Sequence, residues 1–352
     1  MEFLIEYGLF LAKSLTVLVS ILVVIVVIFG STQRQRDPEV GHIEVKNLND
    51  SLEGVTQSLK SIVLNPELLK KDAKEEKKKG KEKYKTQKKD LKQGEGPRPR
   101  MFVVDFVGDV QASEVVNLRE EITAILSVAE DQDEVLVRLE SPGGVVHGYG
   151  LAASQLQRIR NKSVPLTVAV DKVAASGGYM MACIANKIIA APFSLLGSIG
   201  VVAQIPNFHR ILKKNDIDVE ILTAGEYKRT LTLFGENTDK AREKFVDDLE
   251  DVHELFKDFV LDNRPQLDME KVATGEAWFG KRALERDLVD ELKTSDEYIV
   301  DSCANRDVFL VKYVIHKNKI DKIFERVTRL WMGSALSRQT MLQQTLPNQF
   351  IQ

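Results

Sequence analysis

The sequence has few of the residues that build disulfide frameworks and metal sites. Its 352 residues include two cysteines, Cys183 and Cys303, and five histidines. Two thiols cannot form a disulfide framework or a cysteine-rich cluster, and the histidines show no HExxH pair or other ligand spacing. We therefore expect neither a metal nor another cofactor. The length allows two domains, or one large domain with appendages.

The chain also carries little net charge, but the near balance conceals two regions of opposite sign. The formal net charge is −3; residues 1–100 carry 19 Lys and Arg against 14 Asp and Glu, whereas residues 101–352 carry 30 against 38. A nucleic-acid-binding domain is expected to be basic where it folds. Because the larger region is acidic, we expect no nucleic-acid partner.

One stretch near the amino terminus has no charge at all. The 20 residues between Lys13 and Arg34 are uncharged, and about 20 helical residues cross a hydrocarbon core. The alternative is a cleaved signal peptide, which usually has a shorter apolar region of about 7–15 residues and a small-residue cleavage site. We predict a retained anchor at about 9–30 that makes the lipid bilayer a partner. Basic residues after the span favour a cytoplasmic body by the positive-inside rule.

A lysine-rich segment separates this stretch from the rest of the chain. Residues 70–92 hold 12 Lys against 5 Asp and Glu, and such a segment cannot bury enough surface to offset its ordering entropy. We predict a disordered tether, with contact to anionic lipid head groups as the alternative. The predicted organisation is an anchor, a helical spacer (38–68) and the tether in 1–100, a globular domain in 101–300, and a C-terminal strand, amphipathic helix and flexible tail in 301–352.

From residue 101 onward, short β-rich runs alternate with amphipathic helical patterns. This alternation predicts an α/β layered fold. The expected strands are 101–106, 134–139, 165–170, 187–191 and 218–222, and the expected helices are 114–129, 145–160, 177–186 and 239–262. A second apolar stretch, 188–205, is interrupted by Pro, Ser and Gly, and we interpret it as buried core.

Three local segments carry candidate chemistry. Glu140–Val145 (ESPGGV) lies between a predicted strand and a predicted helix. Paired glycines there allow backbone N–H groups to point at a developing negative charge. Read alone, Pro-Gly-Gly is most often simply a turn.

The second and third segments supply a hydroxyl and an amine. In Asp171–Tyr179 (DKVAASGGY), Ser176 is flanked by small residues at a strand-to-helix junction and can act as a nucleophile; the alternative is a helix N-cap. In Thr223–Thr230 (TAGEYKRT), burial of Lys228 would favour a neutral amine that can take a proton from a serine. The alternative is a surface lysine beside Arg229.

Together these segments resemble the signal peptide peptidase A family, and most of all its SohB-type branch. The resemblance covers roughly 101–300 and rests on segments in a fixed order: Ser141–Gly144 (SPGG), Ala175–Tyr179 (ASGGY), Gly197–Val201 (GSIGV), Gly225–Lys228 (GEYK), 275–280 (GEAWFG) and 283–290 (ALERDLVD). It implies a ClpP/crotonase-like fold and a serine endopeptidase. Ser176 would be the nucleophile, Lys228 the general base, and Ser198 a hydrogen-bond partner of the lysine amine.

The resemblance also implies the surroundings of the reaction. Gly144 and Gly177 would supply the N–H groups of an oxyanion hole, with Gly143 as the alternative to Gly144. The family forms homo-oligomers whose sites face inward. It acts on peptides or proteins, here membrane-associated or signal-type peptides, from a single-pass position in the bacterial inner membrane with a periplasmic catalytic domain.

Other reaction classes compete with this reading. A Ser-His-Asp triad of the ClpP type would place histidine about 25 residues after Ser176, where residues 200–202 contain none. His147 and His209 are more typical of ordinary helix positions. A crotonase-like fold also permits acyl-CoA binding, and a non-catalytic membrane scaffold is the third alternative.

Overall fold

The structure, a computed structural model, describes residues 2–32, 41–65, 67–69, 71, 74, 78 and 98–315. The chain divides into two compact units. One is Ile43–Tyr313, and the other combines Met1–His42 with Val314–Gln352. The motifs described above from residue 101 to 290 lie in the first unit.

The first unit is built on a seven-stranded sheet with the order β1-β10-β2-β3-β4-β6-β9. The strands from β10 to β9 in this order are all parallel. Parallel neighbours need crossover connections, which α4 (Val115–Leu126) and α5 (Val146–Asn161) provide. The strands are β1 (His42–Asn47), β2 (Arg100–Val107), β3 (Glu134–Glu140), β4 (Leu166–Val170), β6 (Lys187–Ala190), β9 (Glu291–Leu292) and β10 (Asp307–Val314).

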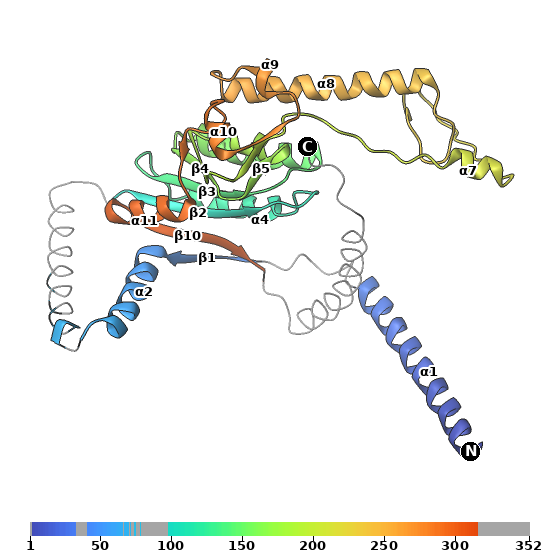
Figure 1. Ribbon diagram of the computed structural model, residues 1–352, viewed down its shortest axis with the longest axis horizontal. Coiled ribbons are helices and arrows are strands. Elements are labelled where there is room, and N and C mark those ends of the chain that lie inside the picture. The colour runs from blue at the N-terminus through green and yellow to red at the C-terminus, as the bar shows by residue number, and fades with distance from the viewer. Residues whose placement is uncertain are drawn as a thin grey trace. The chain divides into compact units, whose positions relative to one another are not determined.

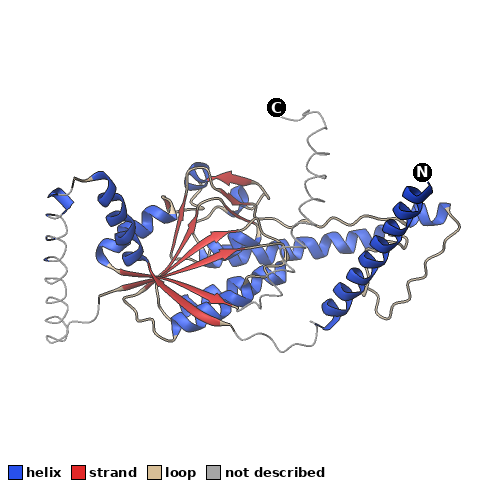
Figure 2. Ribbon diagram, turned by 90° about the horizontal axis from the view of Figure 1, so that it is seen from below, coloured by secondary structure: helices blue, strands red, loops and turns tan. Residues whose placement is uncertain are grey.

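The central strands are buried on both faces. In β2, Val104 packs in one core cluster with Leu118 of α4, whereas the next residue toward the N-terminus, Val103, packs in a second cluster with Ile299 of α11 (Ser295–Asn305). Figure 2 shows helices on both sides of the sheet. Burial on two faces explains why these strands are nearly continuous apolar runs. The predicted α/β layered fold is confirmed.

A smaller sheet has the order β5-β7-β8 and carries Ser176 at its edge. Its strands are β5 (Val173–Ala175), β7 (Leu195–Gly197) and β8 (Ala277–Phe279). The pair β5 and β7 is parallel, and β7 and β8 are antiparallel. Strand β5 leads directly into α6 (Gly177–Ala182), which is shorter than predicted.

The segment between β7 and α8 (Asp239–Asn263) leads away from the sheet and includes α7 (His209–Lys214) (Figure 1). The strand predicted at 218–222 is wrong, because these residues are exposed and have no regular structure. A strand without a neighbour leaves its backbone groups unpaired, so β propensity alone does not produce one. After α8 the chain continues through α9 (Met269–Val272), β8 and α10 (Gly280–Leu284), and β8 pairs with β7 of the smaller sheet.

The second apolar stretch is core only in its first part. Ile188 and Ile199 are fully buried, but Val202 is 91% exposed. The interpretation of 188–205 as buried core therefore holds as far as Ile199.

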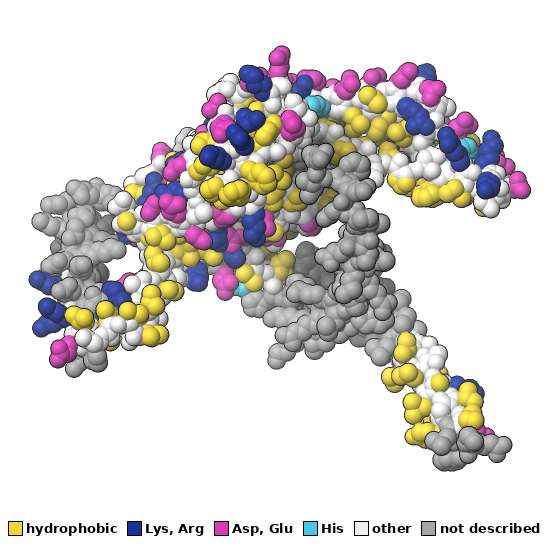
Figure 3. Space-filling model, viewed as in Figure 1, with side chains coloured by type: hydrophobic (Ala, Val, Ile, Leu, Met, Phe, Trp, Pro, Cys, Tyr) yellow, Lys and Arg dark blue, Asp and Glu magenta, His cyan; other side chains and the backbone are white. Residues whose placement is uncertain are grey.

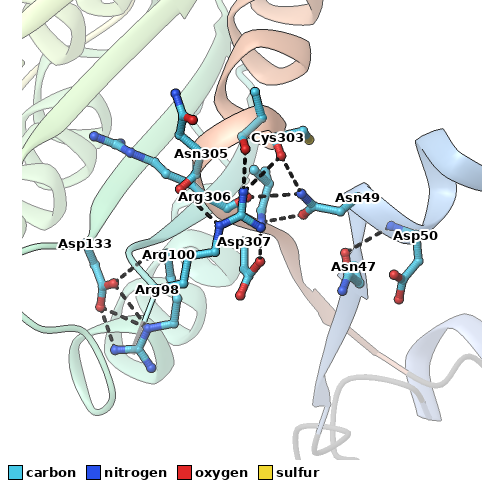
Figure 4. Close-up of polar contacts among 12 residues, drawn as sticks. Asn47, Asn49, Asp50, Arg98, Arg100, Asp133, Cys303, Asn305, Arg306 and Asp307 are labelled. Carbon is cyan, nitrogen blue, oxygen red and sulfur yellow. Dashed lines mark hydrogen bonds and ion pairs between the residues drawn. The ribbon is translucent and has the colours of Figure 1, made fainter. Parts of the chain in front are cut away.

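The predicted helical spacer begins with a strand. β1 joins the sheet beside β10, and α2 (Leu48–Val63) follows it. The Asn49 amide donates to the carbonyl oxygens of Cys303 (3.1 Å) and Arg306 (3.0 Å), and its Oδ1 accepts from the Val308 N–H at 2.7 Å. Figure 4 shows Asn49 pointing at the end of α11. The last carbonyls of a helix lack intrahelical partners, so Asn49 caps α11 from a distant segment.

The predicted anchor coincides with α1 (Glu2–Thr32), whose side chains are described for residues 5–21. Within the described part of the chain, no helix is both long enough and apolar enough to cross a membrane. The span predicted at about 9–30 stays a prediction. Apart from a few positions, the tether at 70–92 lies outside the described residues, as do the amphipathic helix and tail predicted after residue 315.

Candidate active site

Ser176 lies between β5 and α6 in a strained backbone conformation. Its φ is +53° and its ψ is −119°, a combination that costs a non-glycine residue on the order of 1–3 kcal/mol. The Ser176 N–H donates to the Gly197 carbonyl oxygen (2.8 Å), and the Met180 N–H donates to the Ser176 carbonyl oxygen (3.0 Å). Ser176 occupies the N-cap position, yet its side chain makes no capping bond. The N-cap alternative therefore does not account for this serine.

The Ser-Pro-Gly-Gly turn lies directly against Ser176. The Ser141 N–H donates to the Val173 carbonyl oxygen (2.8 Å), and the Ala175 N–H donates to the Ser141 carbonyl oxygen (3.0 Å), so the end of β3 is bridged to β5. Gly143 has a φ of +89°, and a Cβ added there would fall 2.7 Å from the Ser176 Cβ. Both the backbone conformation and this contact exclude a side chain at Gly143.

The three predicted oxyanion-hole glycines differ in whether their N–H groups are free. The Gly143 N–H donates to Ser141 Oγ at 3.1 Å. Within the described chain, no hydrogen bond is made by the N–H of Gly144 or of Gly177, which is the first residue of α6 and has no intrahelical acceptor. A Cβ would fall 2.2 Å from the Val110 carbonyl oxygen at Gly144 and 2.4 Å from a Tyr149 ring atom at Gly177. The turn and α6 thus present two free amides beside Ser176.

Ser198 immediately follows Gly197, the residue whose carbonyl oxygen accepts from the Ser176 N–H. Gly197 ends β7 with a φ of +96°, and Ser198 continues in the left-handed region with a φ of +52°. The Ser198 N–H donates to the Glu276 carbonyl oxygen at 2.6 Å. Ser198 is therefore adjacent to Gly197, whose carbonyl oxygen accepts the hydrogen bond from the Ser176 N–H. No hydrogen bond joins the described side chains of Ser176 and Ser198.

Lys228 lies in the exposed segment between α7 and α8. Its N–H donates to the Gly225 carbonyl oxygen at 3.2 Å in a turn. The side chain is exposed, and it forms no hydrogen bond or ion pair with the described residues. The structure does not bring Lys228 to Ser176 within one chain.

Comparison with protein families places the chain in a known group. Peptidase family S49 N-terminal matches residues 2–156, and Peptidase family S49 matches residues 158–308. The chain belongs to peptidase family S49. It is a serine-type protease, as its S49 relatives indicate.

Relatives of this S49 peptidase match it over most of its length. "Probable protease SohB" of Haemophilus influenzae is 51% identical over 325 residues, which cover 91% of this chain and 92% of the relative. "Probable protease SohB" of Buchnera aphidicola subsp. Schlechtendalia chinensis is 50% identical over 304 residues, which cover 85% and 99%. The resemblance to the SohB branch is confirmed.

A solved structure similar to this S49 peptidase is that of a mutant "1510-N membrane-bound stomatin-specific protease", described as in complex with a substrate peptide. It is 14% identical, has a TM-score of 0.40, and the match covers 66% of this chain and 98% of that chain.

Other reactive side chains of the S49 peptidase lie in different settings. Cys183 is fully buried, and burial raises the pKa of its thiol well above the ordinary value, which disfavours a nucleophilic thiolate. His147 is exposed on α5. Sequence reasoning missed His253, whose Nε2 lies 3.3 Å from the Ile199 carbonyl oxygen, next to Ser198. Its helical spacing from the buried Phe256 was the available signal.

Proposed function

We propose that this S49 peptidase is a membrane-anchored serine endopeptidase that cleaves membrane-associated or signal-type peptides with a Ser176–Lys228 dyad. The observation that carries the proposal is the setting of Ser176. Its hydroxyl makes no capping bond, its strained backbone is held from two sides, and two free amides lie beside it. A ClpP/crotonase-like fold is part of the proposal, supported by a parallel sheet joined to a smaller sheet that carries the nucleophile.

In the proposed reaction, Ser176 Oγ attacks the carbonyl carbon of the scissile peptide bond and its proton passes to the neutral Lys228 amine. The carbonyl oxygen becomes an oxyanion that accepts hydrogen bonds from the Gly144 and Gly177 N–H groups. The leaving amine then takes the proton from Lys228 as the C–N bond breaks. Water, deprotonated by the same amine, hydrolyses the acyl ester and regenerates Ser176. The Gly143 amide is the weaker choice because it already donates to Ser141 Oγ.

The test of this function is hydrolysis of hydrophobic fluorogenic peptides by the purified full chain and its Ser176→Ala variant. Loss of the nucleophile should lower kcat by about 10³-fold or more. Ser163→Ala is a matched control, because Ser163 also has a positive φ (+59°) but is an exposed residue between α5 and β4. Near wild-type turnover by Ser176→Ala would exclude this nucleophile and favour the scaffold or acyl-CoA-binding alternatives.

The proposed dyad requires Lys228 to reach a Ser176, and we propose that a second copy of the chain supplies it. The segment that carries Lys228 exposes large apolar side chains, including Val202 (91%) and Leu222 (90%). Figure 3 shows hydrophobic side chains gathered along this segment and α8. Exposed apolar surface of this kind is typical of an interaction site. A homo-oligomer would cover it, and Ser198 of the receiving copy would bond the amine.

Mixing two inactive variants tests this assembly. In a co-expressed mixture of Ser176→Ala and Lys228→Arg chains, some sites combine an intact Ser176 with an intact Lys228 from the other copy. We expect activity to return in the mixture, and a sedimentation coefficient above that of a monomer. A mixture that assembles and stays inactive would mean that each chain completes its own dyad.

The proposed inner-membrane anchoring is supported by the 20 uncharged residues between Lys13 and Arg34. The periplasmic side of the catalytic domain is proposed from the family resemblance alone. Protease treatment of intact spheroplasts should digest the catalytic domain and leave cytoplasmic marker proteins intact. A version without residues 1–40 should be released from the membrane fraction. A protected catalytic domain would place it on the cytoplasmic side, as the charges after the span favour.

A further inference from the structure

A buried chain of hydrogen bonds lies behind the Ser-Pro-Gly-Gly turn. Tyr149 of α5 and Ser141 are both fully buried, and their hydroxyl oxygens are 2.5 Å apart. The Tyr149 hydroxyl also lies 2.7 Å from the Asp109 carbonyl oxygen. Because a carbonyl oxygen can only accept, Tyr149 donates to Asp109 and accepts from Ser141. Ser141 Oγ in turn accepts from the Gly143 N–H at 3.1 Å, so the direction of every bond is determined.

The ring of Tyr149 contacts the other half of the site. A Cβ added to Gly177 would fall 2.4 Å from Tyr149 Cγ, so the start of α6 packs directly against the base of this ring. The hydroxyl end of Tyr149 is packed equally tightly, since a Cβ added to Gly108 would fall 2.4 Å from the Tyr149 hydroxyl oxygen. Phe106 packs edge-on against the ring, with centroids 6.5 Å apart. Tyr149 is therefore held rigidly between the turn and α6.

We propose that Tyr149 is the positioning residue that sets the spacing between the Gly144 and Gly177 N–H groups. Its hydroxyl holds the turn through Ser141, and its ring holds the start of α6. This inference rests on the proposed function, in which those two amides bind the oxyanion. An oxyanion hole is effective only when its donors are already placed for the transition state, and one side chain here contacts the supports of both donors.

The hydroxyl is the group that a phenylalanine could not replace. Without it, Ser141 Oγ and the Asp109 carbonyl oxygen lose their shared partner in a buried site, and the turn is held beside α6 only by the backbone bonds of Ser141 to β5. Burial raises the pKa of Tyr149, so the hydroxyl stays protonated and keeps donating through the neutral and mildly alkaline range.

The experiment compares Tyr149→Phe, Ser141→Ala and the double variant in the full chain with peptide substrates. Because an oxyanion donor acts mainly in the transition state, kcat should fall by about 10- to 100-fold while KM changes by less than about twofold. Ser141→Ala breaks the same bond from its other end. The double variant should therefore lose no more than about twofold beyond Tyr149→Phe alone.

Tyr179→Phe is the matched control. Tyr179 is also fully buried, lies on α6, and donates one hydrogen bond to the Leu288 carbonyl oxygen (2.9 Å), away from the turn. It should lose a similar amount of stability but keep kcat within about twofold of wild type. A peptide aldehyde gives a further measurement, because its adduct with Ser176 Oγ places an oxygen in the oxyanion position. Its inhibition constant should rise with Tyr149→Phe and not with Tyr179→Phe.

An unchanged kcat in a folded Tyr149→Phe enzyme would overturn the inference, and so would an equal loss in Tyr179→Phe. If Tyr149→Phe does not fold, Ser141→Ala alone decides the question by the same split between kcat and KM. The proposed function is judged separately, by whether the wild type hydrolyses peptides and Ser176→Ala does not. An active wild type with an unaffected Tyr149→Phe variant would remove only the role of Tyr149.

Discussion

The Ser176 N–H donates to the carbonyl oxygen of Gly197 at 2.8 Å. This bond continues the pairing of β5 with β7 past the end of β5 and ties the predicted nucleophile to the residue just before Ser198. Both residues after the paired strands, Ser176 and Ser198, have a positive φ. The smaller sheet therefore acts as a frame that holds two strained serine backbones at one edge.

Gly197→Ala should disturb this frame. A Cβ at Gly197 would fall 2.9 Å from the Trp278 ring in a residue whose φ is +96°. We expect stability to fall by about 1–3 kcal/mol, with an additional loss of kcat because the carbonyl that holds Ser176 must move. Gly275→Ala is the control, since its φ is +82° but no atom lies within 4 Å of an added Cβ. Urea unfolding and peptide turnover measure both effects, and equal losses of kcat in the two variants would contradict the expectation.

Lys228→Arg should be inactive at every accessible pH, because a guanidinium group cannot give up its proton to act as a base. We expect a loss in kcat of about 10³-fold or more. Lys228→His should recover part of the activity, with a midpoint near the ordinary range of histidine titration. The neighbouring exposed residue offers the control Arg229→Lys, which should retain activity. A substantially active Lys228→Arg enzyme would place the base elsewhere, with His253 as the next residue to test.

Glu121 should make stability depend on pH. Burial raises the pKa of this carboxyl to about 7, and the negative charges of Glu114 and Asp105 add to the rise. Two groups oppose it: the Tyr313 N–H, which donates to Glu121 Oε1 at 2.8 Å, and the positive charge of Lys312. The folded-state pKa exceeds the unfolded one near 4.5, so folding favours the protonated form. The stabilisation is fully present below pH ~4.5 and is lost as the pH rises toward ~7, by up to about 3 kcal/mol.

Glu121→Gln should flatten this dependence, since it removes the titrating group and keeps an oxygen for the Tyr313 N–H. Chemical denaturation at intervals between pH 5 and pH 8 measures the change. The exposed neighbour gives the control Glu120→Gln, which should follow the wild-type curve. An identical slope in wild type and Glu121→Gln would show that another group produces the pH dependence.

Asn49→Ala should destabilise the catalytic unit although Asn49 precedes the Lys-rich segment. It removes three hydrogen bonds, to the Cys303 and Arg306 carbonyl oxygens and from the Val308 N–H, and a buried polar group that loses its partner costs about 1–3 kcal/mol. Ser58→Ala on the exposed face of α2 is the control. For the same reason, deletion of residues 1–40 should preserve stability better than deletion of residues 1–100. Equal unfolding midpoints for the two deletions would show that the β1 edge contributes nothing.

Much of the fold was predictable because its signals are local. The strands β2, β3, β4 and β6 are short apolar runs, and the helices α4, α5 and α8 have helical periodicity. In each case the spacing of apolar residues within the segment indicates both the type of element and the side that is buried. The small residues around Ser176 likewise marked a strand-to-helix junction before the structure placed one there. Family membership followed from motifs whose residues stand close together in sequence, and the S49 profiles confirm it.

The sequence by itself thus determined the α/β class, the family and the position of Ser176 at a chain junction. Only the tertiary structure decided that Asn49 caps α11, that residues 218–222 find no strand to pair with, and that Ser141 occupies the Gly143 amide while Gly144 and Gly177 stay free. Each of these outcomes depends on which backbone groups from distant segments meet. Local propensity carries no information about that, because hydrogen-bond partners are assigned only when the layers pack.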